Sequence, residues 1–118
     1  QATGDEVLVV FADLLRAMMR HDDIISRIGG DCLAVLLPGA TPRDAECICR
    51  NVVETLSDVS RAGGNGMHIT ASAGLARIGR SLDSTMKRAE LALFHARATG
   101  RNRLATEQLP SSWRADAA

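Results

Sequence analysis

The sequence predicts a mixed α/β (α+β) domain built of two layers. Two observations carry this prediction. Three long stretches have apolar residues every three or four positions, which is typical of amphipathic helices, and shorter apolar runs bounded by Gly, Pro, Asn or Asp are typical of strands. The chain has 118 residues, 46% of them hydrophobic, which is long enough for a core without disulfides or a structural metal.

The first predicted element is a helix over residues 4–20. Its apolar positions recur at helical spacing and are Val7, Leu8, Phe11, Leu14, Leu15 and Met18. Two strands are predicted next, over residues 24–28 and 32–37. The turn residues between them, 29–31, have the sequence Gly-Gly-Asp and predict a tight hairpin.

A second helix is predicted from Pro42, which a first helical turn tolerates, to the glycine-rich loop 63–66. The predicted elements that follow are one strand in segment 67–78, a third helix over 82–98 and a short strand over 103–105. The remaining residues contain a proline, two serines and a lone tryptophan, which is typical of a frayed end or linker. We therefore expect one domain over residues 1–105 and a flexible C-terminal tail over 106–118.

Composition excludes several classes of partner and site. Lys and Arg total 14 against 14 Asp and Glu, so the formal net charge is zero and a general nucleic-acid or membrane-surface binder is not expected. The three cysteines have no C-x-x-C spacing and no clustered histidines, which argues against a zinc site or a disulfide framework. With no membrane span or signal peptide in the pattern, the expected location is the cytoplasm.

The run of residues 27–33, RIGGDCL, resembles the signature hairpin of the GGDEF family, the diguanylate cyclase domain of bacterial second-messenger signalling. Four further blocks resemble the family's motifs in the family's order: residues 4–8 its G-D-x-V-L helix start, 37–38 the end of the hairpin, 69–76 its T-x-S-x-G-x-A strand, and 89–102 its A-D-x-A-L-Y-x-A-K-x-x-G-R-N block. The resemblance implies a nucleotidyl-cyclase or palm-like fold, whose central, mainly antiparallel sheet is flanked by helices.

The resemblance implies an enzyme that joins two GTP molecules, one on each of two facing domains, with the help of a divalent metal. Here Asp31 keeps the third signature letter, but Cys32 replaces the acidic fourth letter and Leu33 replaces Phe. A thiol is a soft, weakly acidic group where Mg²⁺ prefers a carboxylate. The family's first strand, with its metal-binding aspartate, is expected ahead of Gly4. We therefore predict an inactive domain with a vestigial Asp31, no metal site and no cofactor, except Mg²⁺ if GTP still binds.

Arg20 and Asp23 form an R-x-x-D motif, and five residues separate Asp23 from Gly29. In the family, this motif at this spacing is the inhibitory site that binds the product, cyclic di-GMP. Arginine can donate to guanine O6 and N7, and a carboxylate can accept from the N1 and N2 hydrogens of the opposite edge. A second arginine of the following helix often completes the site, and Arg50 or Asn51 occupies that region. The alternative is a solvated Arg/Asp turn at a helix end.

Five residues match the family's GTP contacts: Asp5, Gly29, Gly30, Arg97 and Arg101. Each also has a structural explanation. An aspartate near a helix start is a common capping residue, hairpin turns favour glycines, and arginines at a helix C-terminus complement the helix dipole. The sequence leaves both explanations open for these positions.

The leading hypothesis is a degenerate GGDEF domain that binds cyclic di-GMP at Arg20 and Asp23 and acts as a receptor or regulatory domain. We expect it to work as a homodimer or with a partner domain in a larger protein, without nucleic-acid or membrane contact. Two alternatives remain open. One is a dimerisation or structural module that binds no nucleotide, and the other is a regulatory domain that binds GTP without turnover.

Overall fold

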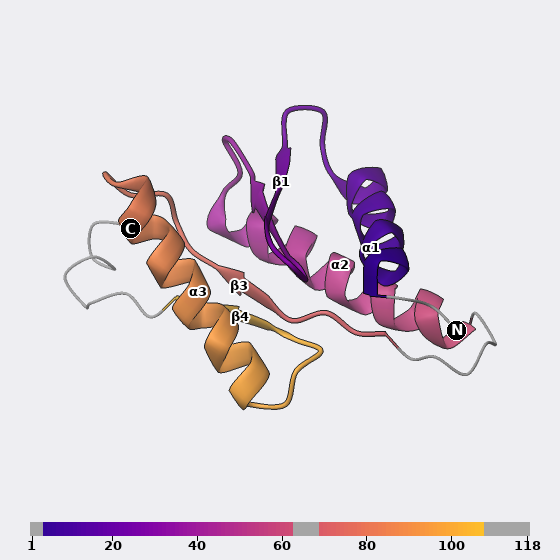
Figure 1. Cartoon of the computed structure of the whole chain (residues 1–118). Helices are drawn as coiled ribbons and strands as arrows, with labels where there is room; N and C mark the ends of the chain where they lie inside the picture. Colours follow the sequence, from indigo (N-terminus) through magenta and orange to yellow (C-terminus); the bar gives the residue numbers. More distant parts are fainter. Residues whose placement is uncertain (1–3, 63–68, 108–118) are drawn as a thin grey trace. The chain divides into compact units, whose positions relative to one another are not determined.

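The computed structural model describes residues 4–62 and 69–107, with side chains from residue 7 onward. It divides into two compact units, Gln1–Ala71 and Ser72–Ala118, each of which is described by itself. The first unit contains α1 (Gly4–Met18), β1 (Ile24–Gly29), β2 (Cys32–Leu36) and α2 (Pro42–Ala62). The second contains β3 (Ala73–Leu75), α3 (Leu82–Ala98) and β4 (Leu104–Thr106) (Figure 1). The predicted mixed α/β class and element order are confirmed.

The core of the first unit lies between its two helices, which are in contact. Leu15 of α1 is buried, and the buried apolar residues of α2 recur at helical spacing: Ala45, Val52, Val53 and Leu56. Thr41 caps the start of α2, because its hydroxyl accepts a hydrogen bond of 3.1 Å from the backbone N–H of Asp44. Pro42 then occupies the first turn, where the missing N–H costs nothing.

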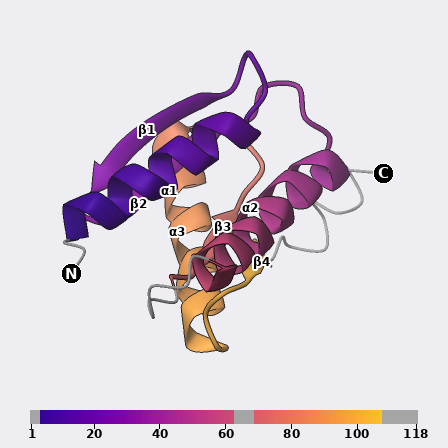
Figure 2. The ribbon, with the colours of Figure 1, turned by 90° about the vertical axis from the view of Figure 1, so that its right-hand side faces the viewer.

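The hairpin of the first unit pairs β1 and β2 in antiparallel fashion, with Ile24 opposite Leu36. The arrow of β1 is seen in Figure 2. The register shifts by one residue between Arg27 and Gly29, so the end of the hairpin is bulged. The Arg27 side chain spans this irregular end. Its Nε donates to the carbonyl of Gly29 at 3.2 Å and its Nη2 to the carbonyl of Gly30 at 2.8 Å. Arg27 therefore gives each of these two carbonyl groups a side-chain donor.

In the second unit, α3 packs along β3 and β4, which run parallel to each other (Figure 1). The approach of β3 to α3 is very close at Gly74, where an added Cβ would lie 2.8 Å from Cα of Leu93. Only glycine leaves room for this packing. α3 ends at Ala98 and is followed by the C-cap residue Thr99. Gly100 then has a φ of 136° in the left-handed region, and the N–H of Arg101 returns to the carbonyl of Ala96 at 2.9 Å.

The strands differ from the prediction in length and grouping. Of the expected strand 67–78, only Ala73–Leu75 is paired, because its partner β4 is itself three residues long; residues 67 and 68 lie outside the described part. The described strands form two two-stranded sheets, one antiparallel and one parallel, in place of a single mainly antiparallel one. The parallel pair follows from the chain order, because the crossover through α3 brings β4 back in the direction of β3.

Several boundaries also move by one or two residues, and β1 extends to Gly29 while β2 ends at Leu36. The first helix ends at Met18, two residues before the predicted end, because the N–H of Arg20 donates to the side chain of Asp23 at 2.7 Å. At the other end, β4 extends to Thr106, one residue past the expected domain boundary. The backbone N–H of Glu107 then donates to the carbonyl of Leu75 at 3.0 Å. The rest of the expected tail, residues 108–118, lies outside the described part.

Candidate functional site

Arg20 and Asp23 form a closed pair in the connection between α1 and β1. Nη2 of Arg20 donates to Oδ1 of Asp23 at 2.7 Å, and Nε lies 3.0 Å from Oδ1 and 3.2 Å from Oδ2. The backbone N–H of Arg20 donates to Oδ2 at 2.7 Å, and the N–H of Asp23 donates to the carbonyl of Arg20 at 3.1 Å. The i, i+3 spacing thus closes a turn in which both side chain and backbone are paired.

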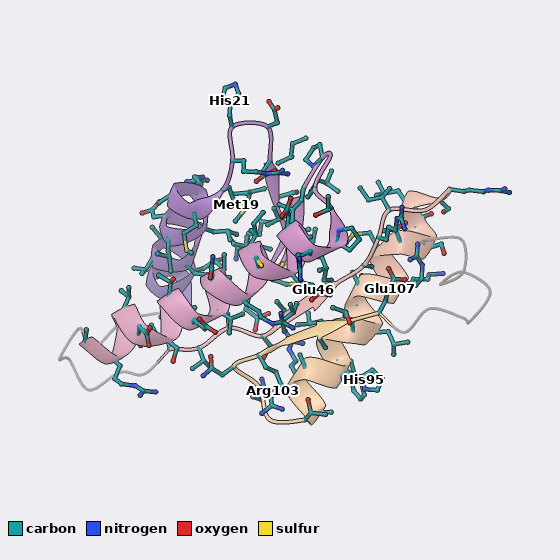
Figure 3. All side chains as sticks on the ribbon, turned by 180° about the vertical axis from the view of Figure 1, so that it is seen from behind. Met19, His21, Glu46, His95, Arg103 and Glu107 are labelled. Atoms are coloured by element: carbon teal, nitrogen blue, oxygen red, sulfur yellow. The ribbon has the colours of Figure 1, made fainter. Side chains whose placement is uncertain are left out.

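The same arginine reaches the far end of the hairpin. Its Nη2 donates to the carbonyl of Pro38 at 3.0 Å, in the connection between β2 and α2. Arg20 therefore joins the segment that enters the hairpin to the segment that leaves it. His21, the next residue, lies at the outer end of the α1–β1 connection (Figure 3).

The two members of the pair differ in solvent exposure. The side chain of Asp23 is 0% exposed, whereas that of Arg20 is 42% exposed. Each carboxylate oxygen of Asp23 accepts from Arg20, so the carboxylate is covered by its own partner. Solvent, and any ligand, meets the guanidinium first.

The charges of the pair stabilise each other. The hydrogen bond that Arg20 donates to Asp23, followed by the charges of Asp23, Asp44 and Asp22, raises the pKa of Arg20. The hydrogen bond from Arg20 lowers the pKa of Asp23 below its usual 3.8. Asp44 acts from the first turn of α2, and Asp22 from within the turn itself. Three carboxylates thus act on one guanidinium.

The signature hairpin places Gly29, Gly30, Asp31 and Cys32 together at one turn. Asp31 is exposed and Cys32 is half-buried. Neither glycine has a positive φ, and an added Cβ at Gly30 would meet nothing within 4 Å. The turn therefore does not need glycine at position 30 for its backbone conformation or for space within the first unit.

Three further predicted contacts, Asp5, Arg50 and Asn51, also belong to the first unit. Asp5 is in the first turn of α1, and its side chain is outside the described part. Arg50 of α2 forms an ion pair of 3.5 Å with Glu46, and Asn51 is exposed. Within the described ranges, no hydrogen bond joins Arg50 or Asn51 to Arg20.

Arg97 and Arg101 belong to the second unit, where both are exposed at the C-terminal end of α3. Arg101 has a φ of 61° and Asn102 one of 49°, so two consecutive residues other than glycine adopt the left-handed conformation. Arg97 and Arg101 are the two predicted phosphate contacts that belong to the second unit.

Sequence reasoning missed the contacts of four residues. The Pro38 carbonyl and Asp44 act on Arg20, Arg27 binds the hairpin turn, and Glu107 pairs with Arg88 of the second unit. Pro38 and Asp44 could not be assigned to Arg20, because their relation depends on how the hairpin brings its two ends together. Arg27 was visible in the signature run, but its role depends on the bulge. Glu107, beside α3 in Figure 3, fell within the expected tail.

The described residues offer an exposed guanidinium, that of Arg20, as a binding group for a ligand. No three His, Cys, Asp or Glu side chains among residues 7–62 and 69–107 gather closely enough to hold a metal ion. No helix in the described part is both long and apolar enough to cross a membrane.

Comparisons with known proteins agree on the relationship of the chain. A family model described as "Diguanylate cyclase, GGDEF domain" matches residues 1–103. The chain is 32% identical over 102 residues to the bifunctional diguanylate cyclase/cyclic di-GMP phosphodiesterase MucR of Pseudomonas aeruginosa. That match covers 84% of this chain and 15% of MucR, so the chain spans a small part of this relative.

Two solved structures have similar folds. The active GGEEF domain of a diguanylate cyclase from Vibrio cholerae matches with a TM-score of 0.79 at 22% identity, over 90% of this chain and 69% of that one. The GGDEF domain of DgcB from Caulobacter crescentus, solved in complex with c-di-GMP, matches with a TM-score of 0.77 at 27% identity, over 86% of this chain and 63% of that one.

Proposed function

The chain belongs to the GGDEF diguanylate cyclase domain family, and from this premise we propose that it is a cyclic di-GMP-binding regulatory domain without cyclase activity. Arg20 and Asp23 form its nucleotide site. The domain acts in the cytoplasm of a bacterium and passes its ligand state to a second copy or to a partner domain.

One observation carries the proposal most directly: the R-x-x-D motif is an ordered pair with an accessible guanidinium. Arg20 is fixed by Asp23 on one side and by the Pro38 carbonyl on another, while 42% of its side chain remains exposed. A preorganised arginine loses little side-chain freedom when it binds a ligand. Guanine, with adjacent O6 and N7 acceptors, fits two N–H groups of such an arginine.

The absence of catalysis is inferred from the donor chemistry of the hairpin. Asp31 is a single exposed carboxylate, and the next position offers the thiol of Cys32. A Mg²⁺ ion prefers oxygen ligands in octahedral geometry, so these residues do not fit a catalytic magnesium site. Loss of an interaction made only in the transition state costs roughly a hundredfold or more in rate.

Isothermal titration calorimetry of the chain with cyclic di-GMP tests the binding. Wild type should bind, and Arg20→Ala should abolish the heat. The matched control is Arg16→Ala, which removes an exposed arginine from the last turn of α1, where it pairs only loosely with Asp13 at 3.6 Å. Absence of heat with wild type would contradict the proposal.

A separate assay tests the inactivity. The chain is incubated with GTP and either Mg²⁺ or Mn²⁺, and the products are separated by chromatography. We expect no cyclic di-GMP. Formation of this product would show that the hairpin still catalyses the reaction.

A second candidate function is GTP binding without turnover, because Arg97 and Arg101 match the family's phosphate contacts and are both exposed at the C-terminal end of α3. In that case GTP binding should survive Arg20→Ala and be lost in the double variant Arg97→Ala/Arg101→Ala.

A further inference from the structure

We infer that the segment after β4, residues 108–118, folds back along α3, and that its Trp113 packs on an apolar patch formed by Leu91 and Phe94. This contact lies within the second unit and does not depend on the nucleotide site. It replaces the expectation of a flexible tail, which rested on composition alone.

α3 carries two large apolar side chains that face solvent. Leu91 is 60% exposed and Phe94 is 65% exposed. Because they are three residues apart on a helix, they are neighbours on its surface. The ring of His95 lies beside that of Phe94, with centroids 6.4 Å apart and planes at 71°. These three side chains, the α3 patch, form one continuous apolar and aromatic surface of the kind that marks a contact site.

Glu107 fixes the start of the segment against α3 (Figure 3). Its carboxylate accepts from Nη1 of Arg88 at 2.5 Å and from the backbone N–H of Arg77, and its own N–H donates to the carbonyl of Leu75 at 3.0 Å. Arg88 and Leu91 are three residues apart, so they lie on the same side of the helix. The segment therefore begins one helical turn from the α3 patch.

The segment has the length and the sequence to return to the patch. β4 begins after the C-terminal end of α3 and leads to Glu107, whose partner Arg88 lies in the N-terminal half of the helix, so the chain must turn back. The sequence Leu-Pro-Ser-Ser at 109–112 is typical of a β-turn. Trp113 follows Glu107 by six residues, which can span up to about 20 Å. Phe94 lies only about 9 Å from Arg88 along the helix axis.

The tethered segment is a better occupant of the patch than a second copy of the chain. A short tether gives Trp113 an effective concentration on the order of millimolar at the patch. A second copy must associate from solution and loses translational and rotational freedom when it binds. Tryptophan also buries a large apolar area, about 150–250 Å², which suits the neighbouring leucine and aromatic rings.

Intrinsic fluorescence of the full chain tests this contact, because Trp113 is the only tryptophan and the chain has no tyrosine. The emission of wild type should be blue-shifted relative to the chain in guanidinium chloride, and acrylamide should quench it several-fold less efficiently. Leu91→Ala and Phe94→Ala should each move the emission and the quenching toward the denatured values, because each removes part of the surface that covers the indole ring.

The matched control is Leu82→Ala. Leu82 is a leucine of the same helix with nearly the same exposure, 59%, but it lies about two and a half turns from Leu91 and therefore on the opposite side. This variant should leave the emission and the quenching of Trp113 unchanged. Circular dichroism of all three variants checks that the helices are intact, which is expected because each replaced side chain is exposed.

Three results would overturn the inference. Wild-type emission equal to that of the denatured chain would show that Trp113 is in water. A blue shift that neither Leu91→Ala nor Phe94→Ala changes would place Trp113 on another surface. A blue shift that disappears on dilution, together with a dimer in analytical ultracentrifugation, would assign the patch to a second copy. None of these results bears on cyclic di-GMP binding, so the proposed function is tested separately.

Discussion

The carboxylate of Glu107, the residue after β4, accepts a hydrogen bond of 2.5 Å from Nη1 of Arg88 in α3. It also accepts from the backbone N–H of Arg77, while its own backbone N–H donates to the carbonyl of Leu75. Arg88 donates further to the carbonyl of Arg77 and to Oγ1 of Thr85, each at 3.1 Å. The side chain of Glu107 is 8% exposed, so these bonds are largely shielded from water.

We predict that Glu107→Ala destabilises the second unit by about 1–3 kcal/mol, because the backbone N–H of Arg77 and the guanidinium of Arg88 lose their shared acceptor. Urea unfolding followed by circular dichroism measures the change. The control is Glu90→Ala, which removes an exposed glutamate from the same helix as Arg88. Equal unfolding midpoints for the two variants would show that the Glu107 contacts contribute little.

Gly74→Ala should be destabilising by about 1–3 kcal/mol, because the new methyl group would collide with the backbone of α3 at Ala89 and Leu93. Neither backbone segment can move away without disturbing the helix. Gly30→Ala adds the same methyl group where nothing lies within 4 Å, and it should leave the midpoint of urea unfolding nearly unchanged. The prediction fails if both variants unfold like wild type.

The Arg20–Asp23 pair should contribute stability that disappears in acid. The pKa of Asp23 is lowered in the folded chain by its hydrogen bond from Arg20, so on acidification the unfolded chain takes up a proton at this site first, near pH 3.8. The contribution is therefore complete above that pH and is lost as the pH falls through the lower folded pKa.

Unfolding temperatures measured between neutral pH and about pH 2.5 check this effect. Asp23→Asn has no carboxylate to protonate at this site, so its unfolding temperature should fall less than that of wild type over the acid range. Asp22→Asn serves as the control and should follow the wild-type curve. Parallel curves for wild type and Asp23→Asn would contradict the predicted contribution.

The cysteines of α2 should differ in reactivity. Burial, together with the charge of Glu46, raises the pKa of the Cys49 thiol to about 11, so little reactive thiolate forms at pH 8. Cys47, on the same helix, is exposed. Brief treatment of the native chain with iodoacetamide, followed by peptide mass spectrometry, should find Cys47 alkylated well before Cys49. Equal labelling in the folded chain, with denatured chain as the reference, would refute the burial argument.

The sequence was a good guide wherever the determining contacts are local. Helical spacing located α2 and α3, and the i, i+3 spacing of Arg20 and Asp23 anticipated a pair that the structure closes within one turn. Which side chain of that pair is covered could not be predicted, because it depends on how Arg20 turns toward Pro38, 18 residues away.

Contacts distant in sequence also explain the errors. Alternating residues predicted a long strand over 67–78, but strand pairing ends where the short partner β4 ends, at a boundary that the alternation itself does not contain. Glu107 fell in an apparent tail because its partners, Arg88 and Leu75, are brought to it only by the path through α3.

The hydrogen bonds of Arg27 hold the turn of the signature hairpin without using the residues expected to take part in catalysis. The carbonyls of Gly29 and Gly30 are held by a side chain within β1, and neither bond involves Asp31 or Cys32. The two positions that would decide catalysis can therefore change while these bonds to the turn stay in place. A hairpin of this kind can keep its shape when its catalytic residues are replaced, and it can then serve a different function.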